Sequence, residues 1–204
     1  IKPDEVVLPS EEVSRILENT DAIGVAVCYC RHKKDLLGDP CKMTKLRHNC
    51  FLLGRTAQFA ISQGFAKPIS IEDAKRIIKE SAEDGLLHKT FYSKSDINRE
   101  IDALCNCCSC CCGELSRYHR GVAPITSLSS YMARSEEDEC IGCGICAENC
   151  PVNAVQVDDE KAVVNEELCI GCGICAYNCP QEAIHLERTG IRQVITPPPR
   201  VSAA

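Results

Sequence analysis

Eight of the 18 cysteines in this 204-residue chain lie in two runs of identical spacing. Each run reads C-x2-C-x2-C-x3-C-P, and the second begins 29 residues after the first. Thiolates three residues apart on a tight loop can converge on one cluster of iron and sulfide, whereas a fourth cysteine before a proline is carried away from that loop. This pattern therefore predicts one-electron chemistry on iron–sulfur clusters. The runs are Cys140, Cys143, Cys146, Cys150 and Cys169, Cys172, Cys175, Cys179.

The residues between these cysteines repeat as well. Ile141-Gly142 recurs as Ile170-Gly171, and Gly144-Ile145 recurs as Gly173-Ile174. Glycine lets the backbone approach a cluster closely and turn its N–H groups toward the sulfides. Zinc and disulfides are the alternatives, but zinc sites usually pair two C-x2-C knuckles through a longer loop and lack the x3-C-P ending. We therefore expect iron–sulfur clusters.

From about Glu139 to Glu187 the chain resembles the small dicluster 4Fe–4S ferredoxin domain of bacteria, on the two runs and their repeat. The resemblance implies two 4Fe–4S clusters held by two related halves. It also implies crossed ligation, because in two-cluster ferredoxins the fourth cysteine of each run binds the other cluster. The implied ligand sets are Cys140, Cys143, Cys146 and Cys179 for cluster 1, and Cys169, Cys172, Cys175 and Cys150 for cluster 2.

The other ten cysteines precede Gly113, and six of them crowd into the tract CNCCSCCCG. Soft thiolates at this density select iron–sulfur clusters, zinc or copper(I). The segment from Arg31 to Arg55 holds seven Lys and Arg against two Asp. This positive charge would offset the negative charge of a cluster. We expect one or two further iron–sulfur clusters; structural zinc, or a thiol-redox or metal-storage role, are alternatives. The candidate ligands, not all expected to bind, are Cys28, Cys30, Cys41, Cys50, Cys105, Cys107, Cys108, Cys110, Cys111 and Cys112.

Two histidines lie near these cysteines. His32 follows Cys30 closely and His48 precedes Cys50 by two residues. Each is a candidate ligand or hydrogen-bond donor, and the alternative is a solvated surface side chain.

Composition places the chain among globular proteins, with 45% hydrophobic and 25% charged residues. The net charge of −6 disfavours nucleic acid as a partner. The acidic ferredoxin part is expected to steer toward basic docking sites on redox partner proteins. No apolar run is long enough to predict membrane insertion. Because the cysteine spacings suit metals better than bridges, we expect a reducing cytoplasm, in an anaerobe.

The expected fold class is α+β, a ferredoxin-like dicluster domain joined to an N-terminal α/β cysteine-rich domain. The clearest expected helix starts at Ser70, which forms a capping box with Asp73. The predicted domains are 1–120 for the cysteine-rich domain, 121–138 for a linker, 139–190 for the ferredoxin domain and 191–204 for an extended tail. Further predicted elements are a helix at 11–19, a buried strand at 22–30, a polar loop at 31–49, a helix within 50–62, a strand at 86–92 and a helix at 114–119.

The sequence contains neither a G-x-G-x-x-G fingerprint nor a P-loop, so hydride chemistry would need another chain. We therefore predict an electron-transfer protein, a subunit or domain of an anaerobic oxidoreductase complex. The whole chain is also similar to ferredoxin-type proteins of anaerobes with an N-terminal C-x-C-R/H and CNCC-type region, which implies the same role. One alternative is a reductase whose N-terminal site binds a small anionic or thiol substrate beside Arg31, Lys33 and Lys34. The other is a redox-responsive regulator with a winged helix at 70–92.

Overall fold

A single eight-stranded sheet runs through the molecule in the computed structural model, which describes residues 5–92 and 100–200. The strand order is β10-β7-β1-β5-β6-β3-β2-β4, and β8 and β9 form a separate hairpin. Neighbouring strands are antiparallel except for β1 and β7, which are parallel. The strands are β1 Glu5–Val7, β2 Ile23–Val27, β3 His48–Leu53, β4 Lys67–Pro68, β5 Leu87–Tyr92, β6 Ile101–Cys107, β7 Ile125–Ser135, β8 Val155–Asp158, β9 Lys161–Val164 and β10 Ile184–Thr196.

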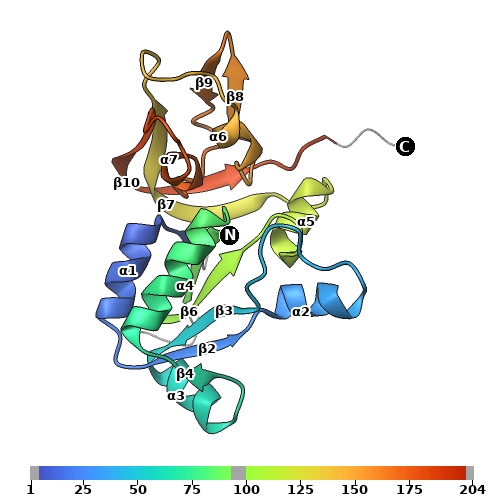
Figure 1. Ribbon diagram of the computed structural model, residues 1–204, viewed down its shortest axis with the longest axis vertical. Helices are drawn as coiled ribbons and strands as arrows, with labels where there is room; N and C mark the ends of the chain where they lie inside the picture. Colours follow the sequence, from blue (N-terminus) through green and yellow to red (C-terminus); the bar gives the residue numbers. More distant parts are fainter. Residues whose placement is uncertain (1–4, 93–99, 201–204) are drawn as a thin grey trace.

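Two helices, α1 and α4, pack side by side on one face of the N-terminal strands (Figure 1). Their apolar side chains meet Phe51 of β3 and Leu104 of β6 in one buried core. The Ser70 hydroxyl accepts a hydrogen bond from the Asp73 N–H at 3.1 Å, which confirms the predicted start of α4. The helices are α1 Ser10–Glu18, α2 Tyr29–Leu36, α3 Gly54–Ser62, α4 Ile71–Glu83, α5 Gly113–His119, α6 Ile145–Glu148 and α7 Ile174–Tyr177.

The C-terminal part gathers at one end of the molecule, where α6, α7 and the β8–β9 hairpin lie beyond β7 and β10 (Figure 1). Strands β7 and β10 pair with each other along most of their length, and β7 also pairs with β1. The sheet therefore continues from the N-terminal strands into the strands that support the two cysteine runs.

Residues 121–138 are not a free linker, because Ile125–Ser135 form β7. The serine-rich composition hid this strand. Ser127 and Ser129 occupy its buried positions, where a buried strand usually carries larger apolar side chains. The expected tail is also shorter than predicted, since β10 continues to Thr196. The remaining domain boundaries stay predictions.

Four other local predictions need correction. The strand expected at 22–30 ends at Val27, and α2 occupies the first part of the expected polar loop. The segment 50–62 is divided between β3 and α3 instead of forming one helix. Strand β5 lies between β1 and β6 inside the sheet, so it is not the exposed wing of a winged helix. The strand expected at 86–92 and the helix expected at 114–119 are confirmed as β5 and α5.

Candidate iron–sulfur and metal centres

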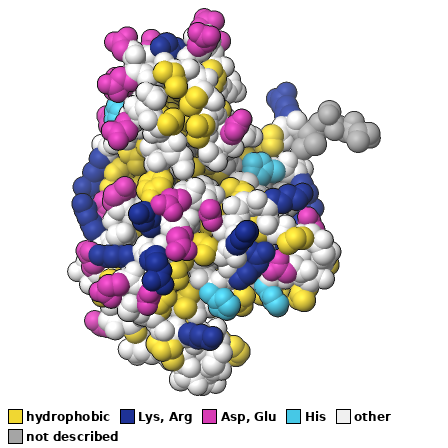
Figure 2. All heavy atoms as spheres, viewed as in Figure 1, with side chains coloured by type: hydrophobic (Ala, Val, Ile, Leu, Met, Phe, Trp, Pro, Cys, Tyr) yellow, Lys and Arg dark blue, Asp and Glu magenta, His cyan; other side chains and the backbone are white. Residues whose placement is uncertain are grey.

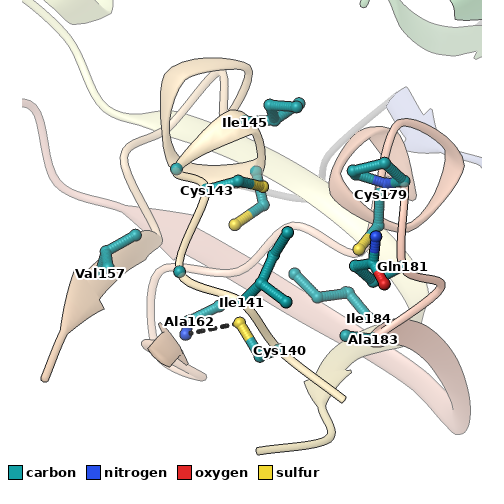
Figure 3. A pocket seen from close by; sticks show the side chains of 14 residues that line it. Cys140, Ile141, Cys143, Ile145, Val157, Ala162, Cys179, Gln181, Ala183 and Ile184 are labelled. Carbon is teal, nitrogen blue, oxygen red and sulfur yellow. Dashed lines mark hydrogen bonds between the residues drawn. The ribbon is translucent and has the colours of Figure 1, made fainter. Parts of the chain in front are cut away.

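The first cysteine run lines a pocket with about 340 Å³ of free space, together with one cysteine of the second run. Figure 3 shows Cys140 and Cys179 approaching this pocket from different sides. The Ala162 N–H donates a hydrogen bond to Cys140 Sγ at 3.3 Å, the kind of contact that orients a metal-bound thiolate. Apolar side chains form most of the rest of the lining. The cysteines lining this pocket are Cys140, Cys143, Cys146 and Cys179.

The second pocket has about 300 Å³ of free space and the complementary set of cysteines. The Ala154 N–H donates to Cys150 Sγ at 3.1 Å. Burial raises the pKa of Cys175 to about 12 and holds the pKa of Cys172 well above its usual value. These thiols are therefore neutral at pH 7 until a metal displaces their protons. The cysteines lining this pocket are Cys150, Cys169, Cys172 and Cys175.

Glycine is required at one repeated position of the two runs. Gly142 and Gly171 have φ angles of +67° and +64°, a region that side chains other than glycine rarely adopt. A Cβ at Gly142 would collide with the backbone of Glu160, and one at Gly171 with the carbonyl of Tyr131. The glycine repeat thus lets each cysteine loop press against a neighbouring segment.

Four thiols around each pocket, backbone N–H donors and apolar walls fit a 4Fe–4S cluster in both places. The structure brings together the cysteines of the two crossed ligand sets. Which sulfur binds which cluster stays a prediction.

The ten N-terminal cysteines fall into two groups. Six thiols, each of which shifts the pKa of the next, form a series that we call the six-cysteine row. The other four form the four-cysteine group, whose sulfurs all lie within 4.8 Å of one another. In order of contact, the row is Cys28, Cys50, Cys105, Cys107, Cys112 and Cys30. The four-cysteine group is Cys41, Cys108, Cys110 and Cys111.

Strand alternation brings part of the row together. Leu104 packs into the α1–α4 core, and the Asn106 side chain bonds His88 on the same face. Cys105 and Cys107 therefore point to the opposite face of β6, because successive side chains alternate. Phe51 of β3 also belongs to the α1–α4 core, which places Cys50 on the face of Cys105. Cys28 and Cys112 lie at the starts of α2 and α5, and Cys30 in the first turn of α2.

Two buried cations accompany these sulfurs. Arg31 is 0% exposed and its Nη1 lies 3.5 Å from Cys108 Sγ. Its guanidinium also donates to the Asn106 carbonyl at 3.2 Å and to the Asn49 side chain. Lys89 is 0% exposed, pairs with Glu114, and stands opposite Cys105 in the β5–β6 register.

These surroundings shift the pKa values of the thiols in the six-cysteine row. Hydrogen bonds from Cys105 and Cys28 lower the pKa of Cys50, against the burial that raises it, and the Arg31 charge lowers it further. Burying a cation is costly unless negative charge lies nearby, so Arg31 and Lys89 suit a region that holds thiolates. The predicted substrate cation Arg31 is buried instead of facing solvent, and Lys89 was not selected by the sequence analysis.

One end of the six-cysteine row shares a buried cluster with the second ferredoxin pocket. Cys112 and Leu115 pack in the same cluster of buried residues as Cys146 and Cys175, and Cys150 packs against it. The Tyr118 hydroxyl of α5 donates to the Val152 carbonyl at 2.9 Å. Helix α5 therefore links the end of the cysteine tract directly to the segment that follows Cys150.

The two candidate histidines do not join these groups. His32 and His48 are both exposed, and neither is part of the four-cysteine group. The adjacent residues Cys110 and Cys111 both belong to the four-cysteine group, with their sulfurs 3.6 Å apart. Cys111 and Cys112, by contrast, are divided between the group and the row.

Comparison with known proteins identifies the class of the C-terminal part. Residues 133–186 match the family described as a 4Fe-4S dicluster domain, which confirms the resemblance read from the cysteine runs. A ferredoxin from Acetoanaerobium sticklandii is 48% identical over 34 residues. That match covers 17% of this chain and 61% of the ferredoxin. The C-terminal part is thus a ferredoxin-type iron–sulfur domain, a class that serves electron transfer. In the described ranges, no helix is long and apolar enough to cross a membrane.

Proposed function

We propose that this chain is a one-electron carrier of an anaerobic oxidoreductase complex and works in a reducing cytoplasm. Cys140, Cys143, Cys146 and Cys179 would hold one 4Fe–4S cluster, and Cys169, Cys172, Cys175 and Cys150 the other. Members of the six-cysteine row would hold a further iron–sulfur centre. When bound, such centres supply reversible one-electron reduction at potentials set by charge, hydrogen bonds and solvent.

The observation that carries this proposal is the buried cluster shared by one end of the row and the second ferredoxin pocket. Cys112 and Cys175 belong to the same buried cluster of side chains. Helix α5 also bonds the segment after Cys150 through the Tyr118–Val152 hydrogen bond. A continuous buried connection favours a relay over two modules that function separately.

The outer end of the ferredoxin domain has the properties of a docking surface for a redox partner. Cys143 is exposed, and Ile141 beside it is 62% exposed. Glu137, Asp138 and Glu139, just before Cys140, are exposed, and Figure 2 shows acidic side chains at this end of the molecule. A basic partner surface would be attracted to this end over long range, while the apolar side chains exclude water at contact.

The test uses the full chain purified without oxygen, its Cys50→Ser variant and Cys41→Ser as the matched control. Iron and sulfide are counted, and electron paramagnetic resonance follows a reductive titration. We expect more than eight irons per chain in the natural sequence, because two cubanes account for eight. Cys50→Ser should lose the additional iron and its signal while the two ferredoxin signals remain, and Cys41→Ser should keep all of them.

Electron transfer itself is measured by mixing the reduced chain with an oxidised one-electron acceptor, such as a bacterial two-cluster ferredoxin. We expect rapid reoxidation that returns the starting spectrum. About eight irons per chain, unchanged in Cys50→Ser, would contradict the further centre. Reduction that cannot be reversed by the acceptor would contradict the carrier role.

A further inference from the structure

The geometry points to a closed zinc site in the four-cysteine group, separate from every iron–sulfur centre proposed above. The Sγ atom of Cys41 lies 3.7 Å from that of Cys108 and 3.5 Å from that of Cys110. The sulfurs of Cys110 and Cys111 are 3.6 Å apart. No other set of three or more Cys, His, Asp or Glu ligand atoms in the described residues converges within 4.8 Å.

These distances match a single ion better than a cluster. Four thiolates around one zinc at about 2.3 Å stand about 3.8 Å from each other in a tetrahedron. In a 4Fe–4S cluster each thiolate binds a different iron, so the sulfurs stand outside a cube and lie farther apart. Among the described residues, no set of ferredoxin cysteines converges within 4.8 Å as these four do, which agrees with the wider spacing of a cluster.

The local backbone explains why closely spaced cysteines can share one ion. The chain turns sharply after β6, and the Cys112 N–H bonds the Cys108 carbonyl at 3.1 Å. This turn carries three of the ligands, while Cys41 comes from the irregular segment between α2 and β3. Cys108 and Cys111 are buried and Cys41 and Cys110 are half-buried, and Leu86 and Met43 pack in the same cluster. Four thiolates leave no open coordination position, as in structural zinc sites.

The surroundings also fit the charge of such a site. One zinc ion and four thiolates carry two negative charges together. Arg31 lies 3.5 Å from Cys108 Sγ, and its Nε has no hydrogen-bond partner among the described residues. A buried guanidinium would stabilise a dianionic centre.

The experiment measures zinc and iron per chain in the full-length protein purified without oxygen, with X-ray absorption at the zinc edge. We expect one zinc per chain with four sulfur neighbours at about 2.3 Å. Cys41→Ser and Cys110→Ser change two partly exposed ligands, and each should remove the zinc or replace one sulfur neighbour with oxygen. Iron content and the iron–sulfur signals should not change.

Cys143→Ser is the matched control, because it changes an exposed cysteine of the ferredoxin domain. This variant should lose iron and keep zinc. A natural chain without zinc, or a single iron in its place, would overturn the zinc assignment. Loss of about four irons in Cys41→Ser would overturn the single-ion site in favour of a cubane. Failure here leaves the Cys50→Ser result intact, so the two proposals can fail independently.

Discussion

The ferredoxin domain and the N-terminal region surround their thiols with different partners. At the ferredoxin pockets, Cys140 and Cys150 accept hydrogen bonds from backbone N–H groups. In the N-terminal region the cationic side chain of Arg31 lies beside Cys108. The donor to Cys150 lies four residues along the chain and the donor to Cys140 lies in β9, whereas the cation beside Cys108 comes from α2, 77 residues away. This difference helps to explain why the ferredoxin domain has a cysteine-spacing motif in its sequence and the N-terminal region does not.

The spacing of the sulfurs also differs between the ferredoxin domain and the N-terminal region. Each ferredoxin set surrounds free space, while the four-cysteine group converges on a point. The six-cysteine row is a third arrangement, a series of thiol contacts across the ends of α2 and α5 and the strands β3 and β6. We infer that the three arrangements hold chemically different centres.

The largest expected effect distinguishes ligation within a run from ligation across runs. Cys150→Ser should remove about four irons, those held by Cys169 and Cys172, because the crossed set loses one ligand. Cys179→Ser should remove the other four. Iron counts and resonance spectra of both variants make the measurement. If Cys150→Ser removed the signal that Cys143→Ser also removes, ligation would follow the sequence runs.

A smaller effect tests the close approach of the ferredoxin loops to the sheet. Gly144 and Gly171 both have positive φ, but a Cβ meets open space at Gly144 and the Tyr131 carbonyl at Gly171. Gly144→Ala should cost roughly 1–2 kcal/mol from the backbone conformation alone. Gly171→Ala should cost roughly 1–3 kcal/mol more, from overpacking. Apparent melting temperatures of the two variants check this, and equal shifts would contradict the packing at Gly171.

The smallest effect concerns the buried cation of the N-terminal region. Arg31→Gln should lower the reduction potential of the N-terminal centre by on the order of 60 mV, a tenfold change in a one-electron equilibrium. The reason is that the buried positive charge favours the reduced, more negative state. Lys45→Gln removes an exposed cation nearby and should change nothing measurable, because solvent screens it. A redox titration of the two variants and of the natural chain measures the difference. Equal potentials in Arg31→Gln and the natural chain would exclude charge compensation by Arg31.

Sequence alone predicted the ferredoxin domain because its ligands are local. Three cysteines of each run lie within one loop, so their spacing encodes a cluster site without knowledge of the fold. The capped helix at Ser70 was predictable for the same reason, since the cap depends on neighbouring residues. Strand β7 was not, because its buried serines are tolerated only where β10 and the Gly171 loop press against it.

Only the tertiary structure divided the ten N-terminal cysteines. Cys41 and Cys108 are 67 residues apart in sequence, but their sulfurs lie 3.7 Å apart. Alternation along β6 places Cys105 and Cys107 on one face, and the turn after the strand directs Cys108 and Cys110 to a different group. A tract of adjacent cysteines carries no signal for this division, since the direction of each side chain is set by strand pairing and by the turn that follows. The sequence determined that this chain binds sulfur-ligated metals; the fold decided which sulfurs meet.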